Sequence, residues 1–427
     1  MTRTNNAITE QASKILPKVL NVLTGKVLTA AFSFASFFYL ARTFSIEEVG
    51  NYVACLSLAM ITSMASNWGI NEFVFRESSI NSKDNNKYLI KSRRSKAYIG
   101  ATILLSVVTF MLAIEVEQTF VEIYILLTLA ALVDAQTISY IVIFRANGIN
   151  KIEMYLFPLR ACAKLLVLFA VAYFNGNLIT LIALWTTVNL GGLLAAHTLY
   201  KKIFGKIGQV GIGPNEIIRI LKVSSPYALT TIISALYLNS APIIIRILED
   251  AGDVAVYGVA MQVFQAMVFV PVSLNIAVQP TLTRLYVSNA QEWSIKAKKL
   301  IKYSVPISIL LSGLSSLIIP DVIVVIFGEE YNEASSLISL LMIAYFASFI
   351  IGSLLTSLYI SSNNTKTYFK IFTIIYLIYI ISNIILLHLF GVHGAVFSFI
   401  LSEMLFFIIL CYVLFKSIFI PTKPNRT

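Results

Sequence analysis

The chain alternates between long apolar runs and short polar stretches along almost its whole length. A helix needs about 20 consecutive apolar residues to cross a bilayer, because each residue adds about 1.5 Å. Twelve runs approach or exceed this length, and they predict an all-α integral membrane protein with twelve transmembrane helices. The predicted spans are 16–40, 50–75, 97–114, 119–144, 155–173, 178–199, 223–245, 255–283, 303–327, 334–359, 371–390 and 392–416.

The polar stretches differ in charge on the two sides of the predicted spans. Most of the 32 Lys and Arg residues fall in alternate stretches, such as 76–96 and 284–302, whereas the intervening stretches are acidic, such as 47–48 and 329–333. Loops rich in Lys and Arg stay in the cytoplasm. One miscounted span would exchange the sides of every later loop, so this division supports twelve spans with both termini cytoplasmic.

The two halves of the chain share weak similarities at matching positions. Residues 38–54 and 243–260 each contain a cation, an acidic pair, a valine and then a tyrosine at the start of a span. An even number of spans per half keeps both halves in the same orientation, as in transporters built from parallel repeats. We therefore predict two pseudo-symmetric six-helix lobes, 1–205 and 223–427, joined by a cytoplasmic linker at 206–222.

Composition narrows the classes of function. The chain is 58% apolar and 12% charged, whereas about a quarter of the residues in a soluble protein are charged. The net charge of +11 is spread over short loops, which argues against a nucleic-acid partner. The three cysteines, Cys55, Cys162 and Cys411, lie in apolar runs without CxxC spacing, so neither a disulfide framework nor a zinc site is expected.

Motifs for nucleotide-driven transport and for catalysis are absent from the sequence. The phosphate-binding pattern G-x-x-x-x-G-K-[ST] does not occur, nor do H-E-x-x-H and G-x-S-x-G. The predicted loops are short, which leaves little room for a sugar acceptor and catalytic acids. We therefore expect a non-enzyme with no catalytic residues, no metal and no cofactor, and a membrane glycosyltransferase or polymerase is a minor hypothesis.

Charged residues lie inside the predicted spans. A charge at the bilayer centre costs roughly 2.5 to 3.5 kcal/mol, so such residues normally face a bundle interior or a watery cavity. Four of them lie near mid-bilayer: Lys26 in the first span, Asp134 in the fourth, Lys164 in the fifth and Glu403 in the twelfth. Arg160, in the fifth span, lies nearer the cytoplasm than these four.

Structural roles compete with a binding role for these residues. Arg160 can extend to the cytoplasmic headgroups, and Asp134 can neutralise Lys26 or Lys164. Glu403 fits a hydrogen-bonded structural carboxyl better than a site. However, Arg160 and Lys164 are one helical turn apart, where like charges repel, and one carboxylate cannot neutralise three cations.

The surplus of positive charge predicts a cationic cavity in the first lobe. Lys26, Arg160 and Lys164 would bind phosphate or another anionic group there, because Arg binds it through a planar fork and Lys as a point charge. Asp134 and Glu403 are the candidates for ion coupling or for partnering a cation.

Three motifs carry a resemblance to a known family. They are A-R-x-x-x-x-E-E-x-G-x-Y at 41–52, G-I-x-E-F at 69–73 and F-R-A-N-G at 144–148. With the twelve spans in two halves, the chain resembles the polysaccharide transporter branch of the multidrug/oligosaccharidyl-lipid/polysaccharide exporter superfamily. The resemblance implies an O-antigen flippase of the bacterial inner membrane, acting in lipopolysaccharide biosynthesis.

Such flippases move undecaprenyl-pyrophosphate-linked oligosaccharide repeat units from the cytoplasmic to the periplasmic leaflet by alternating access between two lobes. Cations in the cavity face the pyrophosphate and the sugars, and Lys26, Arg160 and Lys164 fit that role by position. The implied partners are the lipid-linked glycan, membrane lipids and the O-antigen polymerase machinery.

Other members of the superfamily define the alternatives. A drug or cation antiporter would place carboxylates in the cavity, and only Asp134 and Glu403 lie deep enough to serve. Relatives that flip the peptidoglycan precursor usually carry fourteen spans, so twelve spans argue against that assignment. The O-antigen flippase is the leading expectation.

Overall fold

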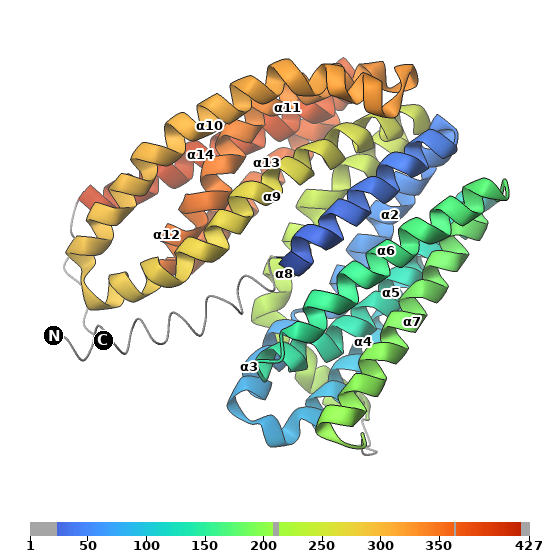
Figure 1. Cartoon of the computed structure of the whole chain (residues 1–427), viewed down its shortest axis with the longest axis horizontal. Coiled ribbons are helices and arrows are strands. Elements are labelled where there is room, and N and C mark those ends of the chain that lie inside the picture. The colour runs from blue at the N-terminus through green and yellow to red at the C-terminus, as the bar shows by residue number, and fades with distance from the viewer. Residues whose placement is uncertain (1–23, 208–212, 363, 420–427) are drawn as a thin grey trace. The chain divides into compact units, whose positions relative to one another are not determined.

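The computed structural model describes residues 24–207, 213–362 and 364–419, and the regular structure in them is entirely helical (Figure 1). Twelve helices among these residues are long and apolar enough to cross a membrane, which confirms the predicted twelve, and the first is Thr24–Thr43. The other α-helices are α2 (Ile46–Asn67), α3 (Ile70–Ile80), α4 (Asn85–Ala113), α5 (Gln118–Ala146), α6 (Lys151–Tyr173), α7 (Leu178–Phe204), α8 (Pro214–Leu248), α9 (Ala251–Ser288), α10 (Ala290–Phe327), α11 (Asn332–Ile350), α12 (Thr356–Ser361), α13 (Thr365–Phe390) and α14 (Val392–Phe419).

Several helices extend beyond the apolar runs that predicted them. Helix α4 begins at Asn85 and α10 at Ala290, so the stretches 76–96 and 284–302 are largely helical. The prediction of loops at these two places is therefore wrong. Hydropathy detects only the part of a helix that suits lipid, whereas the polar turns before it continue the same backbone hydrogen bonds.

The chain forms two compact units that divide between Ile243 and Ile244. Most of α8 belongs to the first unit by this division. The lobe boundaries expected from the sequence, 1–205 and 223–427 with a linker between them, stay a prediction.

Helix α5 is the centre of the first unit. It packs against α2, α4 and α7, and its residues Tyr140–Phe144 are all buried. They form one apolar core with Ile70 of α3, Leu89 of α4 and Tyr200 of α7. The rings of Tyr140 and Tyr200 meet edge to face, with centroids 5.5 Å apart. Aromatic packing of this kind ties α7 to α5, and aliphatic contacts add α3 and α4 to the same core.

Lys96 of α4 is a fully buried cation in the first unit. Its Nζ donates hydrogen bonds to Asn71 Oδ1 at 2.5 Å, to Ser139 Oγ at 3.0 Å and to the Ala135 carbonyl at 3.3 Å. These three acceptors match the three donors of an ammonium group. The sequence placed Lys96 in a cytoplasmic loop, and this is wrong because α4 starts three turns earlier and carries the side chain inside.

The second span of each half begins with the same kind of helix cap. Ser45 and Glu48 form a reciprocal capping box at the start of α2. At the start of α9, the side chain of Asp250 accepts a hydrogen bond from the backbone N–H of Asp253 at 2.9 Å. Caps of this kind satisfy backbone donors that a helix start leaves unpaired. The acidic pairs that suggested a repeat are therefore helix-start signals.

A sharp corner separates α2 from α3, where the sequence predicted one span. Trp68 and Gly69 both adopt left-handed backbone conformations, with φ of 44° and 69°. Helix α8 approaches the corner closely: a Cβ added to Gly69 would lie 2.6 Å from Tyr227 Cβ and 2.8 Å from the Ser224 carbonyl oxygen. Only glycine satisfies both the backbone angle and this close approach.

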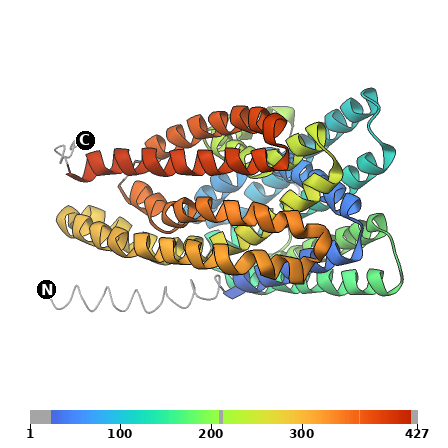
Figure 2. The ribbon, with the colours of Figure 1, turned by 90° about the horizontal axis from the view of Figure 1, so that it is seen from above.

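In the second unit, α11 packs against α9, α10 and α14, and α13 packs against α14 (Figure 2). Helix α11 continues into α12 through a π-helical turn, Ile351–Leu355. A π-turn shifts the backbone hydrogen-bond register, and the Gly352 carbonyl accepts a hydrogen bond from Asn275 Nδ2 at 2.8 Å. Asn275 Oδ1 in turn accepts from Ser357 Oγ at 2.6 Å. This buried polar chain joins α9 to the turn.

The corner at Gly69 generates a test of the fold. In the Gly69→Ala variant, we expect the free energy of unfolding to fall by about 2 to 5 kcal/mol, because a left-handed L-residue costs about 1 to 2 kcal/mol and overpacking about 1 to 3 kcal/mol. Thermal melting of the detergent-solubilised protein measures this. Gly313→Ala is the matched control, because an added Cβ there meets nothing within 4 Å. Equal melting temperatures for the two variants would contradict the packing described here.

Candidate functional site

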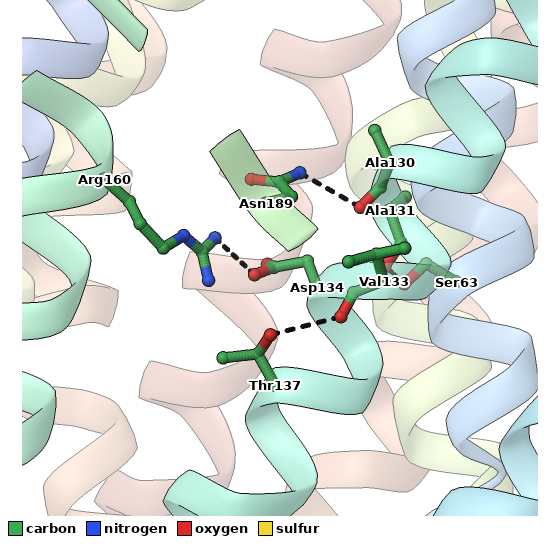
Figure 3. Close-up of polar contacts among 8 residues, drawn as sticks. All are labelled: Ser63, Ala130, Ala131, Val133, Asp134, Thr137, Arg160 and Asn189. Carbon is green, nitrogen blue, oxygen red and sulfur yellow. Dashed lines mark hydrogen bonds and ion pairs between the residues drawn. The ribbon is translucent and has the colours of Figure 1, made fainter. Parts of the chain in front are cut away.

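An ion pair inside the first unit joins two of the residues singled out from the sequence. Arg160 of α6 donates from Nη2 to Oδ1 of Asp134 on α5 (Figure 3). The Arg160 side chain is only 11% exposed and that of Asp134 is 34% exposed. The guanidinium also lies over the ring of Phe157, 5.4 Å from its centroid. Arg160 is therefore held inside the unit and does not extend to the headgroups.

Helix α7 provides the space that the Arg160 side chain occupies. A Cβ added to Gly192 would overlap Arg160 Cδ, whereas one added to the neighbouring Gly191 would meet nothing within 4 Å. One turn earlier, Asn189 donates from Nδ2 to the Ala130 carbonyl at 3.1 Å, which fixes α7 against α5 (Figure 3). A glycine at this one position thus lets the guanidinium reach its carboxylate.

Several polar atoms at the site are buried without a hydrogen-bond partner among the described residues. They are Nε and Nη1 of Arg160 and Oδ1 of Asn189. Buried polar groups almost always have partners, so each such atom calls for a water or a ligand. The Arg160 donors would suit an anionic group or ordered water.

Lys164 lies one helical turn beyond Arg160 and faces the same region. Its Nζ lies over the ring of Trp185 on α7, 5.9 Å from the centroid. Trp185 Nε1 in turn donates to the Lys164 carbonyl oxygen at 2.9 Å. The indole therefore fixes both the backbone and the ammonium of Lys164.

A cavity of about 210 Å³ lies beside these residues, within the first unit. Its charged lining residues are Asp134 and Lys164, and Trp185 and Asn189 also line it. The remaining lining residues come from the first helix, α2, α5, α6 and α7: Ser33, Ser36, Phe37, Tyr52, Leu56, Met60, Leu127, Ala130, Ala131, Ala161 and Ile182. The space suits a phosphate group or water, and an oligosaccharide would extend beyond it.

The structure separates Lys26 from this cluster. Lys26 is exposed on the first helix and does not line the cavity. The preceding residue, Gly25, is buried and packs so closely on α6 that an added Cβ would lie 2.8 Å from Met154 Cα. The pairing of Asp134 with Lys26 or Lys164, considered from the sequence, gives way to the pair with Arg160.

Glu403 lies in the second unit, on α14. It is 8% exposed, and it accepts a hydrogen bond from Ser348 Oγ of α11 at 2.6 Å. This environment agrees with a hydrogen-bonded carboxyl in the interior of the unit. Among the described residues, no group of three or more His, Cys, Asp or Glu side chains is placed to hold a metal ion.

Sequence reasoning missed the residues of α7 that complete the site. Trp185, Asn189 and Gly192 recur at intervals of three or four residues, which places them on one face of the helix. This spacing was readable in the sequence. Which helix the face meets was not, because apolar packing partners carry no charge or motif that identifies them.

Three comparisons place the chain among known proteins. A family model described as "Polysaccharide biosynthesis protein" matches residues 15–286. No curated protein sequence matches the chain at a significant level. The structural comparison yields matches that cover nearly the whole chain at low sequence identity, three of which are described here.

One similar structure is a lipid II flippase, MurJ, in an inward closed conformation, with a TM-score of 0.68 and 14% identity, covering 91% of this chain and 86% of that one. Another is an inward-facing multidrug resistance MATE family transporter of the MOP superfamily, with a TM-score of 0.71, 12% identity and coverages of 94% and 100%. The Vibrio cholerae MATE transporter VcmN in its bent form has a TM-score of 0.59 and 12% identity, and the match covers 96% of this chain and 97% of that one. These likenesses confirm the two-lobe, twelve-helix fold.

Adjacent glycines in α7 provide a test of the site geometry. Gly192→Ala should displace Arg160 from Asp134 and lower the free energy of unfolding by about 1 to 3 kcal/mol, the usual range for overpacking. Gly191→Ala should leave stability almost unchanged, because its added methyl group is unopposed. Thermal melting of both purified variants measures the difference. Equal stability of the two would show that α7 does not confine Arg160.

Proposed function

Since the chain belongs to the polysaccharide biosynthesis protein family, whose model matches residues 15–286, we propose that it is a lipid-linked oligosaccharide flippase. Its cargo in this proposal is the undecaprenyl-pyrophosphate-linked O-antigen repeat unit, moved from the cytoplasmic to the periplasmic leaflet by alternating access. The protein would act in the bacterial inner membrane and deliver the repeat units to the O-antigen polymerase machinery.

The observation that carries the proposal is the excess of positive charge beside the internal cavity. Arg160 and Lys164 are two cations, and Asp134 is the one carboxylate that lines the cavity. Two donors of Arg160 remain without partners among the described residues. A guanidinium paired with that carboxylate, together with an ammonium that lines the same cavity, favours a phosphate or pyrophosphate group, which brings the missing negative charge.

The cavity volume limits which part of the cargo these residues would contact. About 210 Å³ admits a charged group but not a sugar chain. The proposed role of Arg160 and Lys164 is therefore to bind the pyrophosphate end alone. Lys26 is exposed on the first helix, and in this proposal it would contact cargo outside the cavity.

Asp134 is a candidate for ion coupling or for partnering a cation in this proposal. Its ion pair with Arg160 supports the second role. Glu403 remains a second candidate for coupling, in the other unit.

A drug or cation antiporter is the second candidate, because multidrug transporters share the fold. Asp134 would then bind the organic cation or the coupling ion. The two cations near Asp134 oppose this, since they would repel a positively charged drug. A membrane glycosyltransferase or polymerase is a third and weaker alternative, and product analysis with the purified protein would detect its activity.

Complementation tests the proposed function directly. We expect the wild-type chain, expressed with its matched glycan cluster in a flippase-deleted strain, to restore surface polysaccharide. Lys164→Ala and Lys164→Gln should reduce export at least about tenfold, because loss of a charged hydrogen bond costs about 1.5 to 3 kcal/mol. Lys164→Arg should retain export. Surface-polysaccharide blots and membrane expression are measured in parallel.

Lys202→Gln is the matched control, because Lys202 is an exposed cation of α7 remote from the cavity lining. Failure of the wild-type chain to restore polysaccharide would refute the flippase proposal. Full export by all Lys164 variants would instead show that Lys164 does not bind the cargo. Resistance to cationic drugs without polysaccharide export would favour the antiporter.

A double mutant tests whether the ion pair between Asp134 and Arg160 serves only the stability of the fold or is also needed for transport. Asp134→Asn should lower stability by about 3 to 5 kcal/mol, because it leaves Arg160 buried without its counter-charge. Adding Arg160→Gln should restore stability, since both charges are then removed. We expect export to stay below about a tenth of wild type in the double mutant. Recovery of export together with stability would show that the pair is structural only.

A further inference from the structure

A second hollow of the first unit lies on the opposite side of α5 from the cavity just described. It is a groove of about 640 Å³ between α4 and α5. Val133 and Gln136 of α5 line the groove, whereas Ala130 and Asp134 line the internal cavity. Helix α5 is therefore a wall shared by two distinct hollows.

The polar end of the groove carries Arg93 and Arg94 of α4. Arg93 Nε donates to Gln136 Oε1 at 3.2 Å, and Nη1 donates to the Tyr140 hydroxyl at 2.5 Å. The guanidinium also lies over the Tyr140 ring, 5.0 Å from its centroid. Gln136 Nε2 returns a bond to the Arg93 carbonyl at 3.1 Å. These contacts hold the Arg93 fork in one orientation.

Arg93 nevertheless has no carboxylate partner among the described residues. Its guanidinium contacts two neutral groups, the Gln136 amide and the Tyr140 phenol. An arginine has five N–H donors, and two of them make these bonds. A half-buried, oriented guanidinium whose charge is not neutralised by protein is suited to a phosphate.

The rest of the groove is apolar and runs along the helix toward the opposite membrane face. Ala97, Ala101 and Leu104 of α4 line one side, and Leu129 and Leu132 of α5 line the other. From Arg93 to Leu104 the helix rises about 16 Å at 1.5 Å per residue. This length equals about half of the 30 Å hydrocarbon core, that is, one leaflet.

The depth of the arginines fits a headgroup. Arg93 and Arg94 lie within a turn of Ala97, where the apolar run of the third span begins, on the side that the charge pattern assigns to the cytoplasm. The groove thus begins at the level of the lipid phosphates and continues into the acyl region of the same leaflet. Cytoplasmic leaflets are rich in anionic lipids.

Helix α4 is also among the most exposed spans of the protein. Only 17% of its apolar stretch is buried, and the lowest value, 6%, belongs to α10, the third span of the second half. Helix α10 repeats the chemistry: Lys296, Lys299 and Tyr303 line a groove of about 360 Å³ that it forms with α9. Lys296 there also pairs with Glu292 at 3.3 Å. The third span of each half thus places cations beside a groove, although α4 forms its groove with the following span and α10 with the preceding one.

We propose that the α4–α5 groove binds one anionic phospholipid of the cytoplasmic leaflet. Its phosphate contacts Arg93 and Arg94, and one acyl chain occupies the apolar part between Ala101 and Leu129. The apolar part of the groove matches the length of one acyl chain in one leaflet, and the occupant proposed is therefore a membrane phospholipid and not the cargo. Bound there, the lipid would support α5 from the side opposite to Asp134.

Lipid titration of the full-length, detergent-purified protein tests the proposal, with bound lipid counted by native mass spectrometry. The probes are phosphatidylglycerol, phosphatidylcholine with the same acyl chains, and undecaprenyl phosphate. Wild type should bind phosphatidylglycerol in preference to phosphatidylcholine. Arg94→Gln should weaken phosphatidylglycerol binding about fivefold, and the double variant Arg93→Gln/Arg94→Gln about 30-fold, at about 1 kcal/mol per cation.

Two further variants make the result specific to the groove. Ala101→Trp fills the apolar part without changing charge, and it should weaken phosphatidylglycerol binding as much as Arg94→Gln does. Lys201→Gln/Lys202→Gln removes two exposed cations of α7 outside the groove and should have no effect. Equal affinity for both phospholipids, or equal loss in this control, would overturn the proposal. Tighter binding of undecaprenyl phosphate through the same residues would assign the groove to cargo instead.

Discussion

A charge inside a bilayer needs a partner within the protein, and this requirement organises the first unit around one short stretch of α5. Between Asp134 and Tyr140, that helix receives three cations from its neighbours. Arg160 arrives from α6, and Lys96 and Arg93 arrive from α4. Each is bound differently, by a carboxylate, by neutral oxygens, and by an amide with a phenol. The cost of an unpaired buried charge makes each of these contacts a constraint on how the helices pack.

The interior of the second unit contains few charged groups. Its interior bonds join neutral groups, as between Asn275 and the Gly352 carbonyl or between Asn383 and Ser398. Glu403 is its one deep carboxyl from the sequence analysis, bound by a serine hydroxyl. Two halves with the same helix plan therefore have interiors of different polarity.

Much of the fold was readable because a bilayer imposes a length and a charge rule on each span. The twelve helices and the repeat follow from these rules, and the cap residues Ser45 and Asp250 explain why the repeat is visible. The choice of partners was not readable. Whether Asp134 meets Arg160, Lys164 or Lys26 depends on how each helix is rotated, and apolar faces of similar composition leave that rotation open. Lys96 was misplaced because hydropathy begins a span where the polar turns end, not where the helix begins.

The caps at the start of α2 and α9 also bear on how the protein is made. Each consists of bonds between residues three apart, so it forms as soon as that short segment has been synthesised. The turn that joins the first two spans of each half then reverses the chain before any distant helix exists to pack against it. During synthesis, each half would enter the membrane beginning with a self-defined helical hairpin. Synthesis of each half would thus begin with the same step, the formation of a helical hairpin. The second hairpin would form after the ribosome has synthesised six more spans.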